Sequence, residues 1–157
     1  KEYPKGYKLS YATVLRNIVC LQHIKPENIA VVGFRGYATT PRELSDAKNA
    51  HLKIFDANIV KKDIKHVIKC LSEIFEDIDV LYISIDMDVL DPCYAPGVST
   101  PEVGGLSPHE LITIIRSIEG EIIGCDLVEV SPPYDRAGIT CATSCIIAIE
   151  LIARISR

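Results

Sequence analysis

Several patterns that would assign this sequence to a protein class at once are missing. No apolar run reaches the length of a membrane span, and no signal-peptide pattern opens the chain. The net charge is −4, so positive charge is not in excess, and neither nucleic acid nor an anionic membrane is expected as a partner. No C-x-x-C pair occurs among the six cysteines. The four histidines show no paired ligand spacing, so each is interpreted as structural.

The composition indicates a globular chain. Hydrophobic residues make up 48% of the 157 positions, which excludes disorder and allows a real core in one domain or part of one. The chain begins with Lys1 rather than Met, which suggests that further sequence precedes it. Five cysteines in apolar contexts are expected to be reduced core residues of a cytoplasmic protein: Cys20, Cys70, Cys125, Cys141 and Cys145.

Apolar runs alternate with helical patterns along the whole chain. Strands are predicted at residues 28–34, 51–55, 80–86 and 122–130. Helices are predicted at residues 10–23, from Thr40 onward, and at 61–76, 107–118 and 139–155, the last one well buried. Near-continuous apolar strands between helices indicate an α/β fold with a mainly parallel sheet and helices on both faces, three layers in all. Ligands of such sheets bind beyond the carboxyl ends of the strands.

Two carboxylates stand at the end of the predicted strand 80–86. Asp86 and Asp88 are spaced i, i+2, so in an extended strand they point to one face while Met87 turns into the packing. Carboxylates so placed can share a pair of divalent metals, and unpaired carboxylates are costly in an apolar setting. The dipeptide pattern alone fits a solvated turn or helix cap equally well. The long Pro- and Gly-rich loop 91–105 that follows favours a functional site.

A further carboxylate follows the last predicted strand. Glu129 is a charge in an apolar strand end, with two prolines and no adjacent cation after it. A structural glutamate would need a local cation, so a role facing the substrate is favoured. Asp126 remains open between a functional role and a structural hydrogen-bonding role.

The motifs around these carboxylates resemble the ureohydrolases, the arginase and agmatinase family. The first motif is Ser84-Ile85-Asp86-Met87-Asp88, followed by Asp91-Pro92, Ala95-Pro96-Gly97, Thr100-Pro101 and Gly104-Gly105. The second is Glu129-Val130-Ser131-Pro132-Pro133-Tyr134-Asp135, in a form nearer the agmatinases. The resemblance implies that residues 1–157 form a single C-terminal portion, about half, of an arginase-like fold.

The resemblance also implies the chemistry. The family uses two manganese ions (Mn²⁺) to hydrolyse a small guanidino compound, here most consistent with agmatine, to urea and an amine. Asp86 would bridge both metals and take part in catalysis, and Asp88 would complete the coordination of one metal. Glu129 would receive the substrate guanidinium, and Thr100 would line the pocket near it. A homo-oligomer is expected.

The sequence also departs from the family pattern. The Gly-Gly-Asp-His and Asp-Ala-His-x-Asp motifs, which supply the other metal ligands, do not occur here. Tyr11 stands where the family has a histidine that shuttles protons, so it takes the matching catalytic position. A degenerate, non-catalytic family member is therefore one alternative. A phosphatase with an aspartyl nucleophile is another, although Val89-Leu90 stands where that class has Gly or Thr.

Overall fold

The computed structural model describes residues 9–36 and 41–156. The strands of this part are β1 (Ala30–Phe34), β2 (Lys53–Asp56), β3 (Val80–Asp86) and β4 (Glu121–Val128). Its α-helices are α1 (Val14–Val19), α2 (Pro41–Asn49), α3 (Ala57–Lys62), α4 (Ile64–Phe75), α5 (Pro108–Ser117) and α6 (Ile139–Ile155). Short 3₁₀ helices include η1 (Tyr11–Thr13) and η3 (Met87–Val89). No helix in the described ranges is long and apolar enough to cross a membrane.

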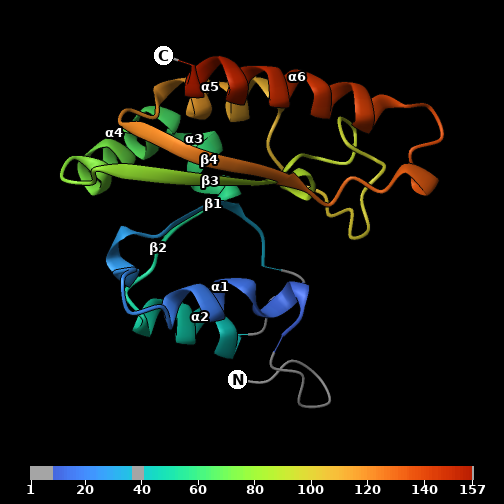
Figure 1. The fold of residues 1–157 in the computed structure, drawn as a ribbon. Coiled ribbons are helices and arrows are strands. Elements are labelled where there is room, and N and C mark those ends of the chain that lie inside the picture. Colours follow the sequence, from blue (N-terminus) through green and yellow to red (C-terminus); the bar gives the residue numbers. More distant parts are fainter. Residues whose placement is uncertain (1–8, 37–40, 157) are drawn as a thin grey trace.

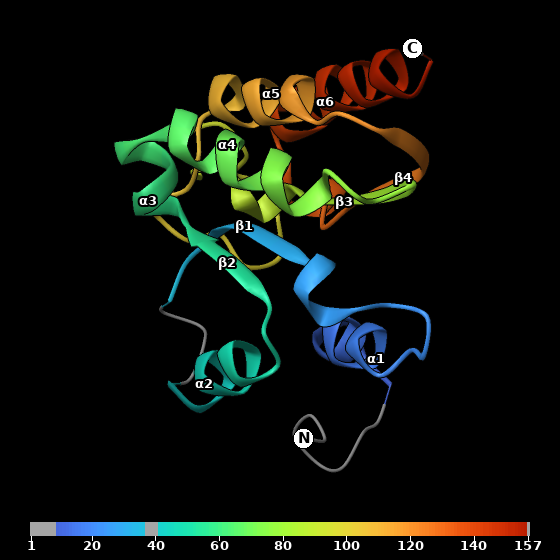
Figure 2. The same ribbon diagram turned by 90° about the vertical axis from the view of Figure 1, so that its left-hand side faces the viewer.

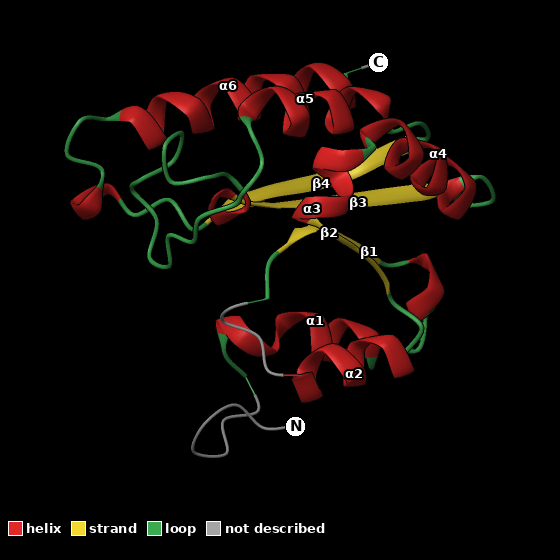
Figure 3. Ribbon diagram, turned by 180° about the vertical axis from the view of Figure 1, so that it is seen from behind, coloured by secondary structure: helices red, strands yellow, loops and turns green. Residues whose placement is uncertain are grey.

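The elements lie in three layers, as predicted. Helices α3 to α6 form one outer layer, the strands lie in the middle, and α1 and α2 form the layer beyond β1 and β2 (Figures 1 and 3). The strands are paired as two parallel ladders, β1 with β2 and β3 with β4, and no hydrogen-bonded ladder joins the two pairs within the described residues. The α/β fold with parallel strands is therefore confirmed, in two separate pairs.

The two faces of the β3–β4 pair have opposite environments. Leu81, Ile85 and Ile122 alternate onto the face that packs under α4, α5 and α6, and each is less than a tenth exposed. Figure 2 shows these helices on one side of the pair. Tyr82 points to the other face and remains 61% exposed, and the neighbouring Ile123 remains 63% exposed. Parallel sheets are normally buried on both faces, so this bare face is unusual.

The total surface agrees with that observation. The accessible surface is 10131 Å². A compact protein of 17.3 kDa exposes roughly 7,800 Å² by the general scaling of area with mass. The excess agrees with the large apolar side chains that stay exposed, among them Tyr82 and Ile123 on the bare face and Tyr11 and Val14 in the layer beyond β1 and β2.

Two helix predictions need correction. The single helix expected at 61–76 is broken, because Asp63 ends α3 in a non-helical backbone conformation and its carboxylate accepts the His66 N–H to start α4. The helix expected at 10–23 is shorter: η1 leads into α1, which ends at Val19. The helix cap predicted at Thr40 lies outside the described residues, although α2 begins at Pro41.

The burial predicted for α6 and the cysteines is also partly wrong. Ile147 and Leu151 of α6 are fully buried, but Ile149 and Ile152 on its other side are about 60% exposed. Cys20 and Cys145 are exposed rather than core residues. All six thiols are free, and the sequence predicted this for five of them, Cys93 being the sixth.

Candidate active site

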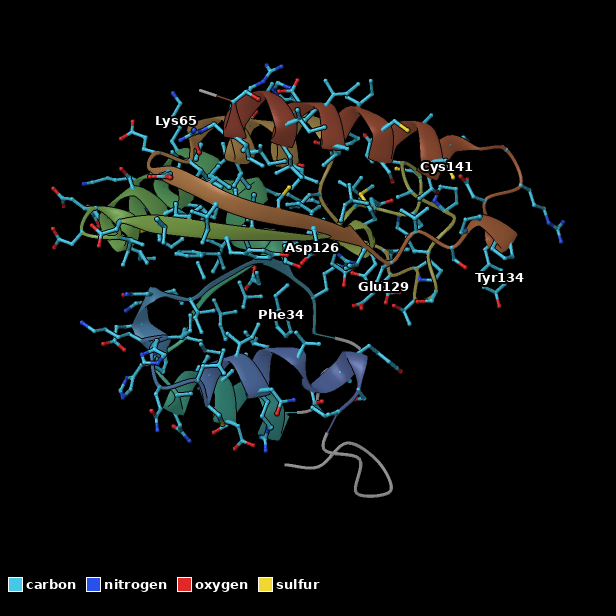
Figure 4. All side chains as sticks on the ribbon, in the orientation of Figure 1. Phe34, Lys65, Asp126, Glu129, Tyr134 and Cys141 are labelled. Atoms are coloured by element: carbon cyan, nitrogen blue, oxygen red, sulfur yellow. The ribbon has the colours of Figure 1, made fainter. Side chains whose placement is uncertain are left out.

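The parallel register of β3 and β4 brings the predicted carboxylates to one edge. Asp86 is the last residue of β3 and pairs with Val128, so Glu129 follows directly at the end of the neighbouring strand. Figure 4 shows Glu129 beyond the ends of the two strands. The sequence prediction that these side chains come from adjacent strand ends agrees with this placement.

The geometry between Asp86 and Asp88 differs from the predicted strand alternation. Asp86 ends the strand, and Asp88 lies in the 3₁₀ turn η3. The Asp88 N–H donates to Asp86 Oδ1 at 3.0 Å, so a turn rather than a pleat sets their spacing. Met87 is fully buried, as predicted.

The electrostatics of this edge are strongly negative. The pKa of the Asp86 carboxyl is raised to about 7, mainly by burial and also by the charges of Asp88 and Glu129, against the opposing hydrogen bond from the Asp88 N–H. Three carboxyl groups therefore influence one another closely. A bound cation would relieve that repulsion.

The loop after η3 contributes two hydroxyls to the site. Thr100 Oγ1 donates to Asp88 Oδ2 at 2.9 Å, so the predicted pocket residue contacts a carboxylate of the proposed metal pair. Ser99 Oγ donates a short hydrogen bond to Glu129 Oε2. The sequence reasoning missed Ser99. Adjacent hydroxyls at 99 and 100 were a visible signal, but only the antiparallel bridge of Val98 with Val130 determines which hydroxyl reaches Glu129.

The same loop is fixed to the start of α6. Ser131 N–H donates to the Gly97 carbonyl at 2.8 Å, and Gly97 N–H donates to Thr140 Oγ1 at 2.7 Å. Asp135 accepts the N–H groups of Thr140 and Cys141 at 3.0 and 2.8 Å, which lowers the pKa of its carboxyl. These hydrogen bonds tie the loop after η3 and the segment after Glu129 to the start of α6.

Glu129 has an unusual backbone. Its φ angle is +68°, one of two positive values among non-glycine residues in the described ranges. A left-handed conformation costs a non-glycine residue about 1–2 kcal/mol. Strain of this kind is common where a side chain must be aimed at a ligand.

Asp126 is held by two hydroxyl groups of β3. It accepts hydrogen bonds from Tyr82 Oη at 2.9 Å and from Ser84 Oγ at 2.6 Å on the bare face of the β3–β4 pair. Figure 4 shows Asp126 on β4, before Glu129. These contacts support the hydrogen-bonding role that the sequence left open for Asp126.

Tyr11 opens η1 in the helical layer beyond β1 and β2, and its side chain is 77% exposed. Ser10 precedes it, and the Ser10 N–H donates to Thr13 Oγ1 at 2.9 Å, consistent with the predicted helix start. The part in proton transfer that the sequence predicts for Tyr11 stays a prediction.

The donor set fits part of a metal site. No group of three or more His, Cys, Asp or Glu side chains that could hold a metal is found in residues 9–36 and 41–156. Asp86 and Asp88 supply carboxylate oxygens, the ligand type that Mn²⁺ accepts. Metal binding by Asp86 and Asp88 therefore stays a prediction, and it would need further ligands.

Comparison with solved structures establishes the fold. The structure of formimidoylglutamase from Bacillus subtilis superposes with a TM-score of 0.90 over 99% of this chain at 23% identity, which establishes the shared fold. Proclavaminate amidino hydrolase from Streptomyces clavuligerus superposes with a TM-score of 0.88 at 29% identity, covering 96% of this chain and 50% of that one.

The family follows from the sequence. The model of the arginase family matches residues 1–153, and the chain belongs to that family. A mitochondrial guanidino acid hydrolase of Homo sapiens is 32% identical over 97% of this chain and 44% of its own length. A guanidinobutyrase of Pseudomonas aeruginosa is 31% identical over 94% of this chain and 46% of its own length. The chain thus spans about half the length of these relatives.

Proposed function

We propose that this chain supplies the carboxylate half of an active site that hydrolyses a guanidino compound to urea and an amine. The observation that carries the proposal is the convergence of Asp86, Asp88 and Glu129 at the paired ends of β3 and β4. Membership of the arginase family supports the same reaction class.

Glu129 is proposed to bind the guanidinium group. A planar cation and a carboxylate form strong paired hydrogen bonds. Ser99 occupies Glu129 Oε2, so it fixes the carboxylate while leaving acceptor capacity for the substrate. The left-handed backbone of Glu129 aims this side chain from a strand end rather than from a flexible loop.

Asp86 and Asp88 are proposed to hold Mn²⁺, together with ligands from outside this chain. When bound, a pair of such ions lowers the pKa of water so that it becomes a nucleophile at neutral pH. Asp88 is oriented for this role by Thr100, and Asp86 by the N–H of Asp88.

Agmatine is the proposed substrate. Relatives named agmatinase, such as that of Proteus mirabilis at 30% identity, stand beside others named guanidinobutyrase. Family membership also disfavours the aspartyl-nucleophile phosphatase. The degenerate alternative differs from the proposal in one measurable respect, which is turnover.

The test is urea release by the protein in its native sequence context, with Mn²⁺ and with agmatine, 4-guanidinobutyrate or arginine. We expect release from agmatine first. Glu129→Gln should lower kcat/KM at least about thirtyfold, equivalent to roughly 2 kcal/mol for a lost charged partner. Glu119→Gln, an exposed carboxylate before the opposite end of β4, is the matched control and should leave the rate unchanged. No urea from any of the three compounds would contradict the proposal and favour the degenerate alternative.

A further inference from the structure

Arg35 lies just after β1 and reaches across to the turn that carries Asp88. Its Nη1 donates to the Val89 carbonyl at 2.9 Å, and its Nη2 donates a short hydrogen bond to the Asp88 carbonyl. The side chain is only 9% exposed. The planar fork of a guanidinium suits two neighbouring carbonyls, which an ammonium cannot bridge in the same way.

The Arg35 guanidinium forms one long ion pair, in which its Nη2 lies 4.0 Å from Asp88 Oδ1. Its Nε is buried and has no hydrogen-bond partner among the described residues. Burying a cation is costly, so its retention here indicates a role beyond packing.

The backbone of β1 is shaped to bring Arg35 to this turn. Gly33 has φ +82° beside a break in the β1–β2 register, and a Cβ on Gly33 would lie 2.3 Å from Val89 Cγ2. The end of β1 therefore packs directly against η3. Arg35 binds the carbonyls of Asp88 and Val89, and the Val89 carbonyl also accepts the Leu106 N–H at 2.9 Å.

We propose that Arg35 is a positioning residue for the carboxylate pair. By fixing the peptide groups of Asp88 and Val89, it holds η3 in the form in which the Asp88 N–H binds Asp86 and both carboxylates face a divalent cation. This inference rests on the proposed metal role of Asp86 and Asp88.

The direction in which metal affinity changes when Arg35 is removed distinguishes a positioning role from a purely electrostatic effect. A guanidinium near a cation site repels the cation, so on Coulomb grounds alone its removal would strengthen metal binding. Positioning requires the opposite, because loss of the fork frees the turn. Partners that orient metal ligands typically contribute about 10- to 100-fold in affinity.

The experiment measures Mn²⁺-induced broadening of amide signals of the 157-residue chain by nuclear magnetic resonance, a method that detects weak sites. We expect signals of residues 86–88 to broaden first in the wild type. Arg35→Met should need about 10- to 100-fold more Mn²⁺, and Arg35→Lys, which keeps the charge, should fall between the two.

Arg154→Met is the matched control. Arg154 also bridges two carbonyls, those of Ile118 and Gly120, at the other end of β4, at 2.6 and 3.0 Å. This variant should bind Mn²⁺ like the wild type. If Arg35→Met fails to fold, the Mn²⁺ concentration that Arg35→Lys needs for the same broadening tests the proposal. Unchanged or tighter binding in the Arg35 variants would overturn the positioning role alone, whereas a wild type without broadening at 86–88 would overturn the metal proposal and this inference with it.

Discussion

At the scale of single residues, Glu129 combines a proposed binding role with a backbone that glycine would adopt more readily. Its φ of +68° places it in the left-handed region, and its carboxylate is held by Ser99. A residue selected for stability alone would not be a glutamate here. Strain that persists at a ligand site is consistent with selection for the carboxylate itself.

This strain can be measured by comparing two substitutions at the same position. Glu129→Gly and Glu129→Ala both remove the carboxylate, but only glycine relieves the left-handed backbone. We expect the glycine variant to be more stable than the alanine variant by about 1 kcal/mol. Urea unfolding of the two proteins measures the difference. Equal stabilities would show that the backbone at 129 is not strained.

Asp86 makes the stability of the metal-free protein depend on pH. Its folded pKa is about 7 against an ordinary value of 3.8, so between these values the folded state binds more protons than the unfolded state. Stability should therefore fall as the pH rises through this window. In EDTA, wild type should lose more unfolding free energy between pH 4 and pH 8 than Asp86→Asn. An equal loss in both proteins would contradict the raised pKa.

The sequence pointed to Asp86, Asp88 and Glu129 because charges at apolar strand ends are visible in a linear pattern, whereas Thr100 was implied by the resemblance to the ureohydrolases. Ser99 and Arg35 were missed for a physical reason. Each is recognised only by its partner, and those partners are 30 residues away for Ser99 and 53 or 54 residues away for Arg35.

At the scale of elements, the loop after η3, which carries Ser99 and Thr100, depends on a close approach between Gly97 and Asp135. A Cβ on Gly97 would lie 2.4 Å from Asp135 Cβ and 2.8 Å from its Cα, so no flexible side chain can yield. Gly97→Ala should destabilise the protein by about 1–3 kcal/mol and separate the loop from α6.

Gly36→Ala is the matched control, since a Cβ there meets nothing within 4 Å. Thermal unfolding compares the two variants. A Gly97→Ala protein as stable as Gly36→Ala would mean that the loop and α6 can move apart without cost.

Elements with a strong local pattern were predicted well. The strand at 80–86 and the helix at 139–155 have the bounds expected from their apolar runs. The break at Asp63 was missed because the apolar stripe continues through it, and only the cap on His66 marks the new helix. The arrangement of the strands in two pairs depends on partners far along the chain, which periodicity does not reveal.

At the scale of the whole molecule, the chain should bind metal weakly and release no urea by itself. Two carboxylates leave each ion with most of its coordination shell as water, and the described residues contain no larger ligand group. Calorimetry with Mn²⁺ and a urea assay with agmatine test this expectation. Tight binding of two ions per chain, or urea release, would contradict it.

The bare face of β3 and β4 also affects the heat capacity of unfolding. Tyr82 and Ile123 are already hydrated in the folded state, so unfolding exposes less new apolar area than in a compact protein of this length. Compact proteins gain about 12–15 cal/mol/K per residue on unfolding, and this chain should gain less. Its stability should therefore change more gently with temperature, and its unfolding should respond less steeply to urea. Scanning calorimetry would reveal this as a flatter stability curve, with cold denaturation displaced further from the working range.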